Sequence, residues 1–115
     1  MITQTVLQNI LILFTDECKS LLGDKLYDVR LYGSYARGTQ EEYSDIDVMV
    51  LLDTDDAEAK KYLLPVCGIV SEISLKFNGI VLTPFVCGKN YYNKMKNLPG
   101  FINNIVNEGV SVYAG

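Results

Sequence analysis

The sequence predicts an α/β (α+β) fold, a small mixed β-sheet of three to four strands flanked by helices. Two observations indicate this class. In some segments apolar residues recur three and four positions apart, as on one face of a helix, whereas shorter apolar runs elsewhere have the length of strands. The chain has 115 residues, of which 49% are hydrophobic and 21% charged, as in one globular domain. We therefore expect residues 1–115 to form a single domain.

The overall composition argues against several kinds of protein. With 10 basic and 14 acidic residues the formal net charge is −4, which disfavours an extended nucleic-acid-binding surface. The chain has no histidine, so it cannot form a histidine-bearing zinc site or use an imidazole base. No apolar stretch reaches the ~18–20 residues of a membrane span, and the first residues lack a signal-peptide pattern. These features predict a cytoplasmic protein with no membrane partner.

The three cysteines point to the same compartment. Cys18, Cys67 and Cys87 are far apart in the chain, and each lies in an apolar run or on the apolar face of a predicted helix. An odd number of cysteines in such positions favours buried, reduced thiols over a disulfide framework.

The first predicted element is an amphipathic helix within residues 3–22. Its apolar face consists of residues spaced three and four apart: Val6, Leu7, Ile10, Leu11, Phe14, Cys18, Leu21 and Leu22. Thr3 or Thr5 can cap its start, and Gly23 stands where the helix should end. Residues 26–32 alternate apolar and charged side chains and predict the first strand.

A second strand is predicted over residues 45–52. Its segment 48–52 contains no polar residue, which is typical of a central strand buried on both faces. Asp55 and Glu58 then have a spacing that resembles a capping box, so a helical region should begin there.

Prolines shape the next two elements. Pro65 should break or kink the helical region near Leu64, after which an apolar face continues to Phe77. A third strand is predicted over residues 80–87. Because proline has no N–H to donate to a sheet, Pro84 predicts that this strand lies at an edge, or that the proline occupies a non-donating position.

The C-terminal part predicts three short elements. Residues 91–97 can form a short helix, and Pro99-Gly100 opens another, which Gly109 closes. The residues of that helix expected to face inward are Phe101, Ile102, Ile105 and Val106. The alternation at residues 110–113 predicts a short final strand.

The residues that carry chemistry begin where the first strand ends. Gly33 has no Cβ, so the backbone can turn sharply there and approach a ligand. Ser34 follows at the start of a short helical turn, where free N–H groups favour an anion and its hydroxyl can donate to a phosphate. Gly33 and Ser34 are therefore candidate phosphate-binding residues.

Asp45 and Asp47 are the candidate metal ligands and catalytic residues. They are two positions apart on a predicted strand, so both carboxylates should point to one face. There they repel each other unless a cation lies between them. Mg²⁺ is commonly bound by one or two carboxylates together with substrate phosphates. The glycine-serine turn and the aspartate pair together predict metal-assisted nucleotidyl transfer.

This combination resembles the signature of the DNA polymerase beta-like nucleotidyltransferase superfamily. Gly33-Ser34 is followed by ten residues and then by Asp45-x-Asp47, with Ala36-Arg37-Gly38 after the serine and Ser44 before the first aspartate. The short length is similar to that of the minimal, antitoxin-like branch. The resemblance implies Mg²⁺ held by the two aspartates and an NTP, commonly ATP, whose phosphates bind Gly33 and Ser34. It also implies transfer of a nucleoside monophosphate, commonly AMP, to an acceptor hydroxyl.

The chain departs from that family at one position. Members usually carry a third carboxylate on the later strand. Here that position falls near Thr83, and the predicted strand has no acidic residue. Threonine cannot take a proton at neutral pH. A base would have to come from water, a partner protein or a displaced carboxylate such as Glu41, Glu42 or Asp53, and loss of a base typically lowers the rate ~10²–10⁴-fold.

Arg37 has two interpretations. Its delocalised guanidinium suits phosphate oxygens, so it can be a nucleotide-binding residue that reaches the triphosphate. Alternatively, it forms a salt bridge with Glu41 or Glu42 that holds the loop.

Two functions follow from these patterns. The first is a Mg²⁺-dependent enzyme that transfers AMP or another NMP from an NTP to a hydroxyl acceptor, such as a tyrosine of a partner protein. The second is a catalytically weak or inactive nucleotide-binding module that acts by binding its partner. The chain has no length left for a separate acceptor domain, so the acceptor surface would come from a homo-oligomer or another polypeptide. The resemblance implies a HEPN-domain protein, an RNase toxin, as that companion.

Overall fold

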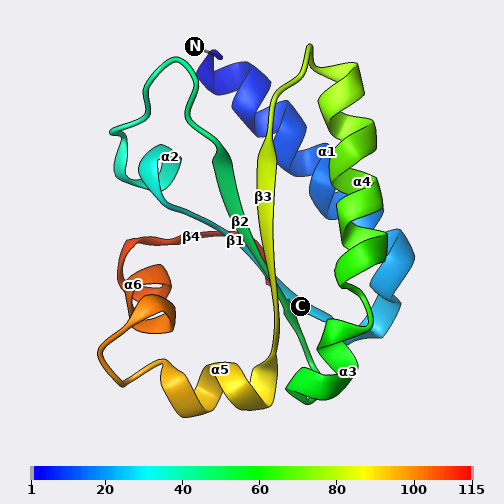
Figure 1. The fold of residues 1–115 in the computed structure, drawn as a ribbon, viewed down its shortest axis with the longest axis vertical. Coiled ribbons are helices and arrows are strands. Elements are labelled where there is room, and N and C mark those ends of the chain that lie inside the picture. Colours follow the sequence, from blue (N-terminus) through cyan, green and yellow to red (C-terminus); the bar gives the residue numbers. More distant parts are fainter. Residues whose placement is uncertain (1, 115) are drawn as a thin grey trace.

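Four strands pair into one mixed sheet in the computed structural model, which describes residues 2–114 (Figure 1). The order across the sheet is β3–β2–β1–β4, where β1 is Leu26–Tyr32, β2 is Ile46–Leu52, β3 is Leu82–Gly88 and β4 is Val110–Ala114. β1 runs antiparallel to both β2 and β4, whereas β2 and β3 are parallel. The predicted fold class, a mixed sheet flanked by helices, is confirmed.

Helices connect these strands and cover both faces of the sheet. They are α1 (Gln4–Leu22), α2 (Ser34–Arg37), α3 (Asp56–Lys60), α4 (Leu63–Lys76), α5 (Lys89–Met95) and α6 (Phe101–Glu108), with a short 3₁₀ turn (Gly23–Lys25) after α1. The hydroxyl of Thr3 accepts a hydrogen bond from the Val6 N–H at 3.1 Å and caps α1. Of the two threonines considered, Thr3 is therefore the cap.

The predicted strands are confirmed with small changes in their bounds. β1 has the predicted bounds, and β2 begins one residue later than predicted. β2 lies between two other strands and is buried along nearly its whole length, as its apolar run indicated. β3 lies at an edge of the sheet and contains Pro84, and β4 forms the other edge.

The helical region after β2 differs from the prediction in the position of its break. The capping interaction is present, because the Asp55 carboxylate accepts a hydrogen bond from the Glu58 N–H at 2.7 Å. However, the interruption lies at Lys61 and Tyr62, and Pro65 is the third residue of α4. An N–H in the first turn of a helix has no partner within that helix, so proline is tolerated there without a kink.

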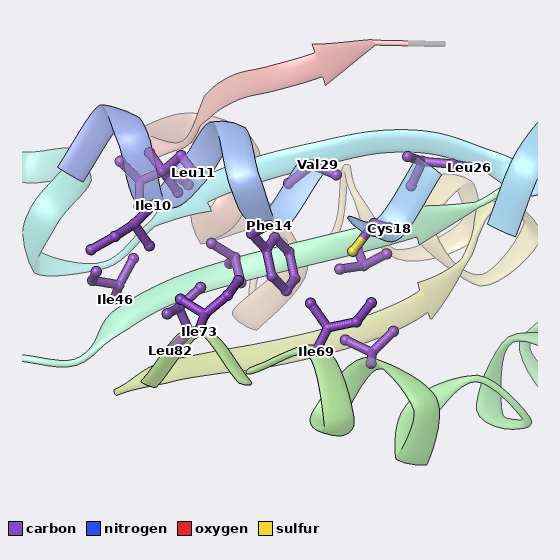
Figure 2. Packing of buried hydrophobic residues seen from close by; sticks show 14 of the residues in the cluster. Ile10, Leu11, Phe14, Cys18, Leu26, Val29, Ile46, Ile69, Ile73 and Leu82 are labelled. Carbon is purple, nitrogen blue, oxygen red and sulfur yellow. The ribbon is translucent and has the colours of Figure 1, made fainter. Parts of the chain in front are cut away.

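One face of the sheet is covered by α1 and α4, which lie side by side (Figure 1). Figure 2 shows Phe14 of α1 and Ile73 of α4 among the side chains that pack against this face. Both are essentially inaccessible to solvent. This larger core holds β1 and β2 in place from one side, and it leaves their ends free to present polar residues.

The other face carries a smaller core under α6. Ile102 and Ile105 pack there against Met49 and Leu51 of β2. Two of the predicted inward residues differ: Phe101 is 52% exposed and Val106 is only partly buried, because α6 covers just one end of the sheet. Phe101 instead packs edge-on against Tyr32, with 5.7 Å between ring centroids.

The cysteine side chains and the helix lengths bear on two further predictions. Within residues 2–114 all three cysteines are free thiols. Cys18 and Cys87 are buried as expected, whereas Cys67, on the outer side of α4, is only partly buried. None of the helices described is both long and apolar enough to cross a membrane.

Candidate nucleotide and metal site

Three polar side chains share one face of the sheet at its α6 end. The strand registers pair Tyr32 with Asp47 and Asp47 with Thr83, so these residues form a row across β1, β2 and β3. Asp47 alternates with the residues that pack against α1 and α4, and it therefore faces the same side as Met49, toward α6. The sheet thus places a carboxylate at the edge of the smaller core.

Gly33 makes the sharp turn that the sequence predicted, directly beside Asp47. Its φ of +75° lies in the left-handed region, where residues with a Cβ are strained. A Cβ built at this position would also collide with the Asp47 carboxylate. Glycine is therefore required here for its backbone angle and for the space next to Asp47.

Asp45 lies just before β2 and reaches the same side of the sheet through Thr83. The Thr83 hydroxyl donates a hydrogen bond to Oδ2 of Asp45 at 3.4 Å, and Thr83 stands beside Asp47 in the row. Thr83, at the position where the family's third carboxylate was expected, thus neighbours both aspartates, Asp45 by a hydrogen bond and Asp47 across the sheet.

The charged form of Asp47 is disfavoured in this site. Burial raises the pKa of Asp47, and the nearby charges of Asp45 and Glu108 raise it further, while Arg37 lowers it. A divalent cation between the two carboxylates would remove this repulsion. Within the described part of the chain, no group of three or more cysteine or acidic side chains is placed to hold a metal ion. Two carboxylates that leave the remaining ligands to phosphates and water fit Mg²⁺.

Arg37 pairs with an acid that the sequence analysis did not consider. Its Nη1 lies 2.9 Å from Oε2 of Glu108, the last residue of α6. Among the described residues, the alternative salt bridge of Arg37 to Glu41 or Glu42 is not formed, so that one of the two interpretations was wrong. The distant Glu108 is placed beside Arg37 by the packing of α6 on the sheet, which no local sequence pattern shows.

Glu108 also contacts the glycine turn. The Gly33 N–H donates to Oε1 of Glu108 at 3.1 Å. The hydrogen bond from Arg37 and that from Gly33 both lower the pKa of Glu108. One carboxylate therefore occupies a position where a backbone N–H and a guanidinium converge on an anion.

These residues line one cavity of about 360 Å³ at the α6 end of the sheet. Its walls include Gly33, Ser34, Arg37, Asp47 and Glu108, with the side chains of Tyr32 and of α6 closing it. Four of the predicted site residues are thus together. Asp45 instead faces a neighbouring hollow with Tyr35, Tyr43 and Ser44, and is joined to the site through its hydrogen bond with Thr83.

Sequence reasoning missed Tyr32 and Glu108. Tyr32 is buried, and burial together with the charges of Asp47 and Glu108 raises its pKa to about 12. Its only signal was its place directly before Gly33. Glu108 carried one weak signal, since an acidic residue in the last turn of a helix is unfavourable with the helix dipole and suggests another partner.

The substitute bases considered from the sequence fare differently. Asp53 follows the opposite end of β2 and lies 3.9 Å from Lys89, so it belongs to another part of the molecule. Glu41 and Glu42 are exposed in the loop before Asp45, which is closed by a hydrogen bond from the Glu41 N–H to the Ser44 hydroxyl at 2.8 Å. Glu42 lines the hollow next to Asp45.

Comparison with known proteins decides the family. Residues 11–112 match the model of the nucleotidyltransferase domain. The chain belongs to the nucleotidyltransferase domain family. The fold is therefore that of a nucleotidyltransferase.

Several relatives of this nucleotidyltransferase are known from Methanocaldococcus jannaschii. One, named "Putative protein adenylyltransferase MJ0141", is 35% identical over 99 residues, which cover 86% of this chain and 91% of that protein. Another, named "Putative protein adenylyltransferase MJ0604", is 32% identical over 100 residues, or 87% of this chain and 91% of that protein. A third, "Putative protein adenylyltransferase MJ1305", is 50% identical over 48 residues, so the match spans 42% of this chain and 33% of that protein.

Solved structures share the fold of this nucleotidyltransferase. A chain from the crystal structure of a toxin–antitoxin with AMP-PNP has a TM-score of 0.56 and 21% identity, over 94% of this chain and 73% of that one. A chain from a mutant of the MntA-HpeT toxin–antitoxin has a TM-score of 0.57 and 18% identity, with the same coverage. At these identities the likeness concerns the fold alone.

Proposed function

We propose that this nucleotidyltransferase transfers AMP from ATP, with Mg²⁺, to a hydroxyl acceptor on a partner protein. The observation that carries the proposal is a cavity lined by Asp47, Gly33, Ser34 and Arg37. Asp45 lines the adjoining hollow and accepts a hydrogen bond from Thr83, the neighbour of Asp47 in the sheet. Acidic side chains for a cation and donors for an anion lie next to each other there, as a metal-bound triphosphate requires.

The phosphates would be held by this chain's own donors. The Gly33 N–H and the Arg37 guanidinium already bind carboxylate oxygens, which shows that both are directed at an anion position. The Ser34 hydroxyl lies on the wall of the same cavity and can add a donor.

Asp45 and Asp47 would hold the Mg²⁺. When bound, the ion neutralises phosphate charge and favours loss of pyrophosphate. The carboxylate of Asp47 is partly buried and lies directly beside the glycine turn. Asp47 would thus hold the ion next to the donors assigned to the phosphates.

The proposed reaction is a substitution at the α-phosphorus of ATP. The acceptor oxygen forms a bond to this phosphorus, the bond to the pyrophosphate oxygen breaks, and pyrophosphate leaves with the electron pair. The acceptor loses its hydroxyl proton. Thr83 cannot accept that proton at neutral pH, so the proton passes to water or to a carboxylate of the site or of the partner.

The names of the relatives support AMP as the transferred group and a protein as the acceptor. Two relatives named as protein adenylyltransferases match this chain over nearly their whole length. A structure with the same fold belongs to a toxin–antitoxin studied with AMP-PNP, an ATP analogue. We propose a tyrosine of a HEPN-type toxin as the acceptor and the cytoplasm as the location, with a second copy of this chain as an alternative source of the acceptor surface.

A second candidate function is a binding module that holds nucleotide and partner without turnover. The observation that favours it is Thr83, which hydrogen-bonds Asp45 at the place where a third carboxylate would stand. Such a module would neutralise its partner by complex formation alone.

Intact-mass measurement distinguishes the two functions. The purified protein is incubated with ATP, Mg²⁺ and a HEPN-type candidate partner protein. The proposal predicts that the partner gains the mass of one AMP, and that the gain disappears with the Asp47→Asn variant. A stable complex with no change in mass, formed equally well by the variant, would support the binding module instead.

A further inference from the structure

Glu108 makes an interaction that the proposed chemistry does not use. Its carboxylate receives the hydrogen bonds of the Gly33 N–H, at 3.1 Å, and of Arg37, at 2.9 Å. These are two of the donors assigned above to the nucleotide. The single N–H of Gly33 cannot serve a phosphate and Glu108 at once. Arg37 has further N–H donors, but the Glu108 carboxylate occupies the place beside its Nη1 that a phosphate oxygen would take.

The position of Glu108 in the fold indicates that its side chain is held in the cavity by these two hydrogen bonds. It is the last residue of α6, where the helix dipole disfavours a negative charge. It also shares a cavity with Asp47, and its charge raises the pKa of that carboxylate. Against these two unfavourable effects stand its hydrogen bonds to Arg37 and Gly33, which lower its own pKa.

We propose that Glu108 is an internal competitor that fills the phosphate position of the free protein and must be displaced when the triphosphate binds. The side chain can leave without unfolding α6, because it lies at the end of the helix and is partly exposed. Its release would free Arg37 and the Gly33 N–H for phosphate oxygens. Glu108 thereby sets the affinity for the nucleotide, and this role rests on the proposed function of the site.

Nucleotide affinity of two variants tests this role. In Glu108→Gln the side chain keeps its size but loses the charge that pairs with Arg37, and in Glu108→Ala the competitor is absent. Both variants should bind Mg-ATP about three- to tenfold more tightly than the unmodified protein, as measured by isothermal titration calorimetry. Glu72→Gln is the matched control, because it removes one negative charge from an exposed position on α4, on the opposite face of the sheet. Its affinity should not change.

Other outcomes would overturn the inference. If Glu108 merely ties α6 to the glycine turn, both variants would have a lower Tm in thermal unfolding and an unchanged or weaker affinity for Mg-ATP. Wild-type binding without any gain in the variants would reject the competitor role while leaving the proposed function intact. Failure of the wild type and of both variants to bind Mg-ATP would reject the two together.

Discussion

At the scale of single residues, burial, neighbouring charges and close packing all act on the side chain of Asp47. It is partly buried, the charge of Asp45 acts on it, and it leaves no space for a side chain at position 33. Its pKa is raised, so its charged form is disfavoured in the folded protein relative to the unfolded chain. A site that holds repelling carboxylates lowers stability in order to bind a cation.

Asp47→Asn should therefore stabilise the protein while removing its activity. Because the pKa of Asp47 is raised in the folded state, the neutral carboxyl stabilises the folded protein relative to the charged one. This stabilisation is fully present at pH values below the pKa of the unfolded chain and is lost as the pH rises through the folded-state pKa. At pH 7 the variant should melt about 1–3 °C higher than the wild type, and the difference should shrink toward pH 4. Thermal unfolding followed by circular dichroism without Mg²⁺ measures this, and a variant that melts lower at pH 7 would contradict the assigned strain.

Thr83 offers a gain-of-function prediction. If the missing third carboxylate limits turnover, Thr83→Asp should increase the rate of AMP transfer, by up to ~10²-fold. The side chain already stands beside both aspartates, so the new carboxylate would enter the site directly. Thr83→Asn is the control of equal size without a proton acceptor and should give no increase. Equal rates for both variants, measured with Mg-ATP and the partner protein, would show that the base lies elsewhere.

At the scale of elements, the packing of α1 on the sheet keeps the two site-bearing strands in register. Phe14 is fully buried at the centre of the larger core (Figure 2). Phe14→Ala should lower the free energy of unfolding by about 3–5 kcal/mol. Urea unfolding provides the measurement.

The exposed neighbour Ile12 gives the matched control on the same helix, because 55% of it is accessible to solvent. Ile12→Ala should change the free energy of unfolding by less than about 0.5 kcal/mol. If the two alanine variants destabilise the protein equally, α1 does not use the face that the structure assigns to the core.

Strands and helices with a clear apolar pattern were predictable from the sequence. The position at which a helical region is interrupted was harder to predict. The apolar run of β2 and the proline of β3 correctly indicated a central and an edge strand. The break near Pro65 was misplaced, because a proline in the first turn begins a helix as readily as it ends one. The pattern could not tell which of these two roles applied.

At the scale of the whole molecule, the site combines a local motif with contacts that only the fold creates. Gly33, Ser34, Asp45 and Asp47 were predicted as site residues from their spacing. The strand, turn and second strand place Gly33, Ser34 and Asp47 on one cavity and Asp45 on the adjoining hollow. Glu108 is 75 residues from Gly33 in the chain and reaches it because α6 packs across the sheet. No local sequence pattern predicts a contact between residues so far apart in the chain. For the same reason Glu108 was not predicted as the partner of Arg37.

The paired aspartates and the adjoining anion position are proposed to bind a nucleotide together with Mg²⁺. The most direct measurement is calorimetric titration of ATP into the purified protein, once with Mg²⁺ and once with a chelator. Binding should be detected with Mg²⁺, should be lost with the chelator, and should be lost in Asp47→Asn even when Mg²⁺ is present. Equal affinity for ATP with Mg²⁺ and with the chelator would contradict the claim.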